Sequence, residues 1–242
     1  MTITVEIVDS DATLADLENI FEYFIWVEQK FSVFKPDSEI SRINRGEIKP
    51  EDYSLEMKEI FSLSEKTKRE TNGYFDIVTA EGKYNPSGLV KGWAISRAAE
   101  LIRQSGFENF YVDAGGDIEV SGNNKDGKPW AVGIRNPFNV KENVKVLYLK
   151  NKGVATSGIY FRGQHIYDPH QPGKKIENIA SLTVLGPNAY EADRMATAAF
   201  AMGESGIYFL EKLAGFEGYL IDQTGRAMFT SGFNNYTGEI ND

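Results

Sequence analysis

The side chains best suited to proton transfer gather in residues 156–169, which read TSGIYFRGQHIYDP. The chain contains two histidines, His165 inside this stretch and His170 just beyond it. Imidazole is the side chain whose unperturbed pKa suits acid–base chemistry near neutral pH. His165 is therefore a candidate acid–base group. The alternative is an outward-pointing strand residue without a role, and the residue alone does not decide between the two.

A second candidate pair, Asp193 and Thr197, lies in the stretch AYEADRMATAAFAM. The spacing of four residues places both side chains on one face of a helix, among alanines. Carboxylate and hydroxyl oxygens are ligands that Mg²⁺ prefers. In the alternative, which the residues alone favour, Thr197 bonds to the Asp193 carbonyl and Asp193 pairs with a basic residue.

Small residues mark two further places where a ligand can approach the backbone. Residues 85–92, NPSGLVKG, predict a loop with Lys91 at its end, leading into a helix over 93–104. Such a loop is typical of an anion cradle, although the Walker A order is missing. Gly115 and Gly116 interrupt a strand pattern and indicate a bulge or a close backbone approach.

Composition limits the class of protein. The 242 residues suffice for one large domain, and 41% apolar and 25% charged residues are ordinary for a globular protein. A net charge of −9 argues against nucleic-acid binding. The absence of cysteine excludes disulfides and thiolate chemistry. We see neither a signal peptide nor an apolar run long enough to span a bilayer, so we expect a cytoplasmic protein, with an exported protein whose signal has been removed as the alternative.

The periodicity predicts an α+β fold. Helix 13–30 is expected to bury the apolar face formed by Leu14, Leu17, Phe21 and Phe24, and residues 123–128 are expected to form a hairpin turn. Residues 31–44 predict either a short capped helix or a loop of hydrogen-bond donors. Further helices are expected over 54–71, 189–202 and 205–214, and strands over 2–8, 110–113, 118–120, 130–134, 144–149, 153–156, 180–184 and the hairpin within 219–230.

Five blocks, in order, resemble the ApbE family of FAD:protein FMN transferases. They are PDSEISRIN, NGYFDI, NPSGLVKGWAISRAAELI with FYVDAGGDIEVSG, VATSGIYFRG with HIYDP, and EADRMATAAFAMG. Together they cover nearly the whole chain. The sequence departs from the family at Asn85 and Ile159, where members often carry Asp.

The resemblance implies a single domain over residues 1–242, with a T-fold-like arrangement of antiparallel or mixed sheets and packed helices. It implies two intertwined lobes with an FAD cleft between them. It also implies Mg²⁺-dependent transfer of FMN from FAD to a threonine hydroxyl of an acceptor flavoprotein, with release of AMP. Hydrolysis of FAD to FMN and AMP, or FAD binding without turnover, are the alternatives. No nucleic acid and no membrane insertion are expected.

The resemblance also assigns roles to residues. His165 is the base, or the group that orients the incoming hydroxyl, and Asp168 fixes either the local turn or the imidazole. Lys91 contacts phosphate, or pairs with Asp76 or Asp117. Asp193 and Thr197 bind Mg²⁺ with a backbone carbonyl near Gly88. The expected FAD-binding residues are Ser41, Asn44, Tyr74, Asp76, Lys91, Gly115, Gly116, Asp117, Thr156, Ser157 and Gly158, with Trp93 a further candidate for stacking on a ring.

Overall fold

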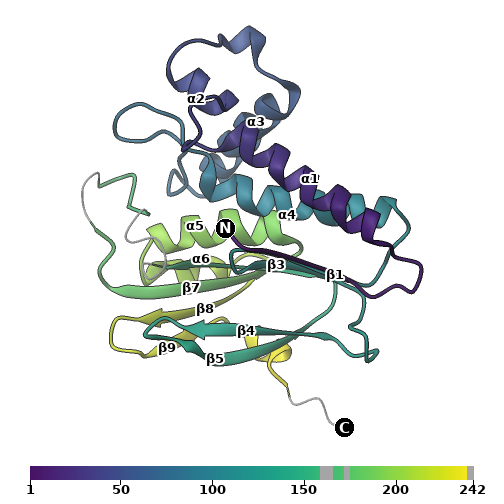
Figure 1. Cartoon of the computed structure of the whole chain (residues 1–242). Helices are drawn as coiled ribbons and strands as arrows, with labels where there is room; N and C mark the ends of the chain where they lie inside the picture. Colours follow the sequence, from purple (N-terminus) through teal and green to yellow (C-terminus); the bar gives the residue numbers. More distant parts are fainter. Residues whose placement is uncertain (159–165, 172–174, 239–242) are drawn as a thin grey trace.

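A seven-stranded antiparallel sheet forms the centre of the molecule (Figure 1). The computed structural model describes residues 1–158, 166–171 and 175–238. The predicted α+β class is confirmed, and the main sheet is antiparallel rather than mixed. In order across the sheet the strands are β1 (Ile3–Ile7), β2 (Phe110–Ala114), β3 (Asp117–Ser121), β6 (Lys152–Gly158), β7 (Ile179–Gly186), β8 (Glu217–Asp222) and β9 (Ala227–Phe229).

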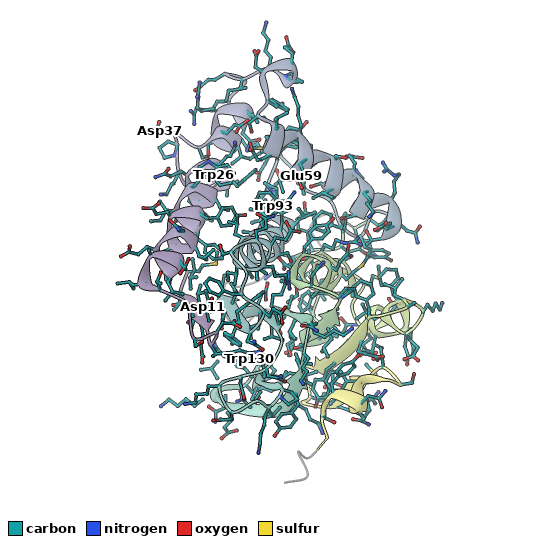
Figure 2. The ribbon with its side chains drawn as sticks, turned by 90° about the vertical axis from the view of Figure 1, so that its right-hand side faces the viewer. Asp11, Trp26, Asp37, Glu59, Trp93 and Trp130 are labelled. Atoms are coloured by element: carbon teal, nitrogen blue, oxygen red, sulfur yellow. The ribbon has the colours of Figure 1, made fainter. Side chains whose placement is uncertain are left out.

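A two-stranded hairpin of β4 (Trp130–Asn136) and β5 (Asn139–Leu149) covers one face of this sheet. Residues alternate between buried and exposed along β4, as expected for a strand with one face against a core. Trp130 and Leu147 pack with Val120 and Val154 of the large sheet. Figure 2 shows Trp130 in this lower layer.

Helices cover the opposite face in two layers (Figure 1). α4 (Ser87–Gln104) and α5 (Ala189–Ala201) lie against the sheet, and α1 (Leu14–Phe31), α2 (Glu39–Asn44) and α3 (Leu55–Glu70) lie outside them. α6 (Ser205–Leu210) packs near β8, and η1 (Pro50–Asp52) and η2 (Phe233–Tyr236) are short 3₁₀ turns. Trp93 packs edge-on against Phe31, and its Nε1 donates to Glu59, so its ring belongs to this core (Figure 2).

The buried face of α1 differs from the prediction. Leu14 and Phe21 are exposed, whereas Phe24 is buried as predicted, together with Ile20, Val27 and Phe31. Both faces of this helix carry apolar residues, and the face at Ile20 is the one that meets α4. Because periodicity does not say which of two apolar faces finds a partner, the prediction for Leu14 and Phe21 is wrong.

Two turns also differ from the prediction, and both matter for the site. α4 begins at Ser87, whose N–H donates to the Asn85 side chain at 3.3 Å, so Lys91 lies in a helix rather than a loop. Gly115 and Gly116 have φ of +66° and +95° and join β2 to β3. They form a tight hairpin turn rather than a bulge, since two consecutive positive φ values suit a two-residue turn.

The turn over residues 123–128 links two layers. The Asn124 N–H donates to the Lys128 carbonyl, which closes the predicted turn. However, β3 and β4 on either side of it belong to different sheets, so it is not a hairpin. This turn carries the chain out of the main sheet and into the β4–β5 layer.

Candidate active site

One cavity of about 420 Å³ lies where α4, α5, the β2–β3 turn and the β4–β5 hairpin meet. Most of the predicted site residues line it, although they come from distant parts of the chain. From the first half of the chain these are Tyr74, Asp76, Gly88, Lys91, Gly115, Gly116 and Asp117, and from the second half Thr156, Ser157, Gly158, Asp193 and Thr197.

Three oxygen-bearing groups of α4 and α5 meet in this cavity. The Thr197 Oγ1 hydroxyl donates to the Gly88 carbonyl at 3.3 Å. The Asp193 Oδ2 atom accepts from the Gly92 N–H at 2.8 Å. The spacing of four residues therefore directs both α5 side chains toward the first turns of α4, as predicted. The Thr197 hydroxyl reaches across to α4 instead of back along its own helix.

Two buried carboxylates share one ammonium group at this point. Lys91 Nζ lies 2.5 Å from Asp117 Oδ2 and 3.8 Å from Asp193 Oδ1. Burial raises the pKa of Asp193 to about 7; the nearby Lys91 charge lowers this pKa, and the Asp117 charge raises it further. Of the two partners predicted for Lys91, Asp117 is confirmed, and Asp76 instead pairs with Lys68 at 2.6 Å. When both are ionised, Asp117 and Asp193 together carry more negative charge than Lys91 offsets, which favours a cation beside them.

The donor set fits Mg²⁺ bound together with a phosphate. A carboxylate, a hydroxyl and a backbone carbonyl are hard oxygen ligands, and Mg²⁺ commonly takes one or two carboxylates while substrate phosphates and water fill its other positions. Within the described residues, no group of three or more His, Asp or Glu side chains has metal-binding spacing. The three oxygen groups would leave the other positions of an Mg²⁺ ion open to water and phosphate oxygens.

The close packing of α4 against α5 depends on Gly92, a role that was not predicted from the sequence. A Cβ atom at Gly92 would lie 2.5 Å from the Ala189 carbonyl oxygen and 2.6 Å from Asp193 Cβ. A Cβ at Gly88 would lie 3.1 Å from Thr197 Cγ2. Two small residues four apart on α4 thus permit close packing against α5. That spacing was the signal in the sequence that could have revealed the contact.

The opposite wall comes from the central strands. Asp117 is buried at the start of β3, and its Oδ1 accepts from the Thr156 N–H at 3.1 Å. The Thr156 and Thr183 hydroxyls lie 2.8 Å apart. The β2–β3 turn beside them presents backbone without side chains at Gly115 and Gly116, so a ligand can approach the chain closely there.

The loop after the central strands reaches the cavity through Ile166, Tyr167 and Pro169. Asp168 is buried and accepts from the backbone N–H of His170 at 2.9 Å and from its Nδ1 at 3.1 Å. Asp168 thus fixes the local turn, as one of the two alternatives predicted. Its imidazole partner is His170, whose ring lies 4.5 Å from that of Tyr74. His165, the predicted base, lies outside the described residues.

Ser41 and Asn44 do not line the cavity. The Ser41 N–H bonds to the Ser38 Oγ atom that caps α2, which confirms the short capped helix rather than a donor loop. The Asn44 side chain bonds to both backbone groups of Tyr84, at 2.9 and 2.8 Å. Both residues therefore hold α2 and its neighbouring loop in place.

Several lining residues were not predicted: Arg135, Asn136 and Asn143 reach the cavity through the docking of the β4–β5 hairpin, whereas Tyr111 and Asp113 lie on β2. Tyr111 donates to the Asp113 carboxylate at 3.4 Å, and Asp113 also accepts from the Gly116 N–H at 2.8 Å. No local pattern marks such residues. The unpredicted polar lining includes Tyr111, Asp113, Arg135, Asn136 and Asn143.

A model of the ApbE family matches residues 1–83 and 79–220. This chain belongs to the ApbE family. It is 33% identical over 154 residues to the FAD:protein FMN transferase of Haemophilus influenzae, covering 60% of this chain and 44% of that protein. It is 26% identical over 243 residues to the FAD:protein FMN transferase of Chlamydia muridarum, covering 76% of this chain and 73% of that protein.

Solved structures share the fold. The flavin transferase ApbE of Vibrio cholerae superposes with a TM-score of 0.82 at 22% identity, over 97% of this chain and 95% of that chain. The apo flavinyl transferase ApbE of Pseudomonas stutzeri gives 0.83 at 18% identity, over 98% and 93%. The ApbE-type architecture predicted from the resemblance is therefore confirmed. In the described part of the chain, no helix has the length and apolar character needed to cross a membrane.

Proposed function

We propose that this protein transfers FMN from FAD to a threonine hydroxyl of an acceptor protein in a Mg²⁺-dependent reaction that releases AMP. The observation that carries the proposal is the meeting of Gly88, Asp193 and Thr197 with Lys91 in one cavity. Membership of the ApbE family and the named activity of the relatives support it.

The proposed reaction forms one bond to phosphorus and breaks another. The threonine oxygen forms a bond to the phosphorus on the flavin side, the pyrophosphate P–O bond breaks, and its electron pair leaves with AMP. The hydroxyl proton passes to a base, for which His165 is our proposal. Mg²⁺ held by Asp193, Thr197 and the Gly88 carbonyl would neutralise phosphate charge during this exchange.

The chain's own groups bind and orient the substrate. Lys91 brings a positive charge to the phosphate side of the cavity, where Asp117 holds its ammonium in place. The Gly115–Gly116 turn leaves room for the dinucleotide beside Thr156 and Ser157. Tyr74 and Asp76, on the opposite loop, complete the wall that we assign to FAD.

One experiment separates transfer from its alternatives. The protein is incubated with FAD, Mg²⁺ and an acceptor protein that carries a threonine flavinylation site, and then in-gel flavin fluorescence and AMP are measured. A fluorescent adduct with AMP supports transfer, and an acceptor with that threonine changed to valine should give none. AMP with free FMN would mean hydrolysis instead, and neither product would mean binding alone.

A further inference from the structure

The three backbone N–H groups that open α5 all have side-chain partners. The Ala189 N–H donates to Glu119 Oε2 at 3.0 Å, and the Tyr190 N–H donates to Ser96 Oγ at 2.9 Å. The Glu191 N–H donates to Asn188 Oδ1 at 2.8 Å. A helix start normally leaves such groups to one capping side chain and water. Here two of the three partners come from other elements, β3 and α4.

Glu119 is a buried carboxylate at the centre of this arrangement, with 2% of its surface exposed. Besides the Ala189 N–H, it accepts from Ser96 Oγ at 2.7 Å and from Arg103 Nη2 at 3.0 Å. A buried charge is retained only when it is well paired, and the start of a helix also favours a negative charge. Glu119 is therefore held firmly by three partners.

These contacts join the elements that carry the candidate metal site. Glu119 lies two residues after Asp117 on β3, so both side chains face the helices. Ser96 lies on α4, which also provides Gly88 and Lys91. Ala189 lies one helical turn before Asp193 on α5. A rotation or slide of α5 relative to α4 would therefore displace Asp193 from the Gly92 N–H and Thr197 from the Gly88 carbonyl.

We propose that Glu119 and Ser96 are positioning residues for the divalent-cation site formed by Gly88, Asp193 and Thr197. Neither Glu119 nor Ser96 lines the cavity, so they act through the placement of α5. The inference rests on the proposed function, because it concerns the cation used in that reaction. Metal sites need their ligands within a fraction of an ångström, and packing and hydrogen bonds supply that accuracy.

The test compares Glu119→Gln and Ser96→Ala with a matched control, Glu100→Gln. Glu100 is an exposed carboxylate on the same helix as Ser96 and pairs with Arg97. Mn²⁺ binding in the presence of FAD is measured by electron paramagnetic resonance, and the KM for Mg²⁺ and kcat are measured with an acceptor protein. We expect the Kd for Mn²⁺ and the KM for Mg²⁺ to rise at least fivefold in both test variants. At saturating Mg²⁺ we expect kcat to stay within twofold, and we expect the control to match the wild type.

Two other outcomes would contradict the positioning role or the proposed function. If folded Glu119→Gln and Ser96→Ala bind Mn²⁺ within twofold of the wild type, the positioning role is wrong while the proposed function stands. If the wild-type protein itself binds no Mn²⁺ with FAD, the metal-dependent function is wrong as well. Ser96→Ala removes one hydroxyl and leaves the Glu119 charge paired with Arg103, so it carries the test should Glu119→Gln fail to fold.

Discussion

Replacing Gly92 by alanine tests whether the contact between α4 and α5 builds the site. The added methyl group would lie 2.5 Å from the Ala189 carbonyl oxygen and 2.6 Å from Asp193 Cβ. Ordinary contacts of this kind are nearly 1 Å longer, so the two helices must separate by roughly that amount. Neither neighbour can rotate away, because one is backbone and the other is a Cβ atom.

The magnitude follows from three effects. Overpacking of a tight core costs about 1–3 kcal/mol. Loss of the hydrogen bond from the Gly92 N–H to the Asp193 carboxylate costs about 1.5–3 kcal/mol. The better helix propensity of alanine returns about 1 kcal/mol. We therefore expect a net loss of about 1.5–5 kcal/mol, which lowers Tm by roughly 3–20 °C for a chain of this size.

The assay is thermal unfolding with and without Mg²⁺ and FAD. We expect Gly92→Ala to lower Tm and also to lose the stabilisation that Mg²⁺ with FAD gives to the wild type. The matched control is Gly238→Ala, because nothing lies within 4 Å of a Cβ atom built there. A Gly92→Ala protein that retains both the wild-type Tm and the wild-type response to Mg²⁺ would refute this reasoning.

Three further predictions concern individual side chains. In metal-free protein the contribution of Asp193 to the free energy of unfolding should decrease as the pH rises from about 4 to 7, because folded Asp193 binds its proton more tightly than the unfolded chain; in denaturant titrations with EDTA, Asp193→Asn should therefore lose less stability over this pH range than the wild type, and an equal loss would contradict the raised pKa. His165→Ala should lose FMN transfer and keep FAD affinity within about threefold in fluorescence titrations, whereas lost affinity would make His165 a binding residue. Asn44→Ala should lower Tm through its lost bonds to Tyr84, while a weakened FAD affinity would show that α2 contributes to the cavity.

A feature could be predicted from the sequence when its signal lies within one segment of the chain. The spacing of Asp193 and Thr197 is a property of one helix, so α5 and its cavity-facing side were predictable. The partner of Lys91 required the tertiary fold, because β3 brings Asp117 beside it from a separate element. The polar side chains of Ser41 and Asn44 looked suited to a ligand, yet they satisfy nearby backbone groups.

Other features depend on strand pairing or on the docking of one element on another, and a single segment does not encode them. The glycines at 115 and 116 fit a bulge and a hairpin turn equally well, and only the pairing of Ala114 with Asp117 decides between them. Arg135 and Asn143 join the cavity because the β4–β5 hairpin docks on the sheet, which no single segment encodes. The arrangement as two intertwined lobes remains a prediction.

The most direct test of the central claim is a titration of FAD binding against Mg²⁺, followed by flavin fluorescence, in the wild type and in Asp193→Ala. If Asp193, Thr197 and the Gly88 carbonyl hold the cation against the pyrophosphate, Mg²⁺ should tighten FAD binding to the wild type at least tenfold. It should tighten binding to Asp193→Ala less than twofold. Equal tightening in both proteins would show that the cation binds elsewhere and would contradict the account.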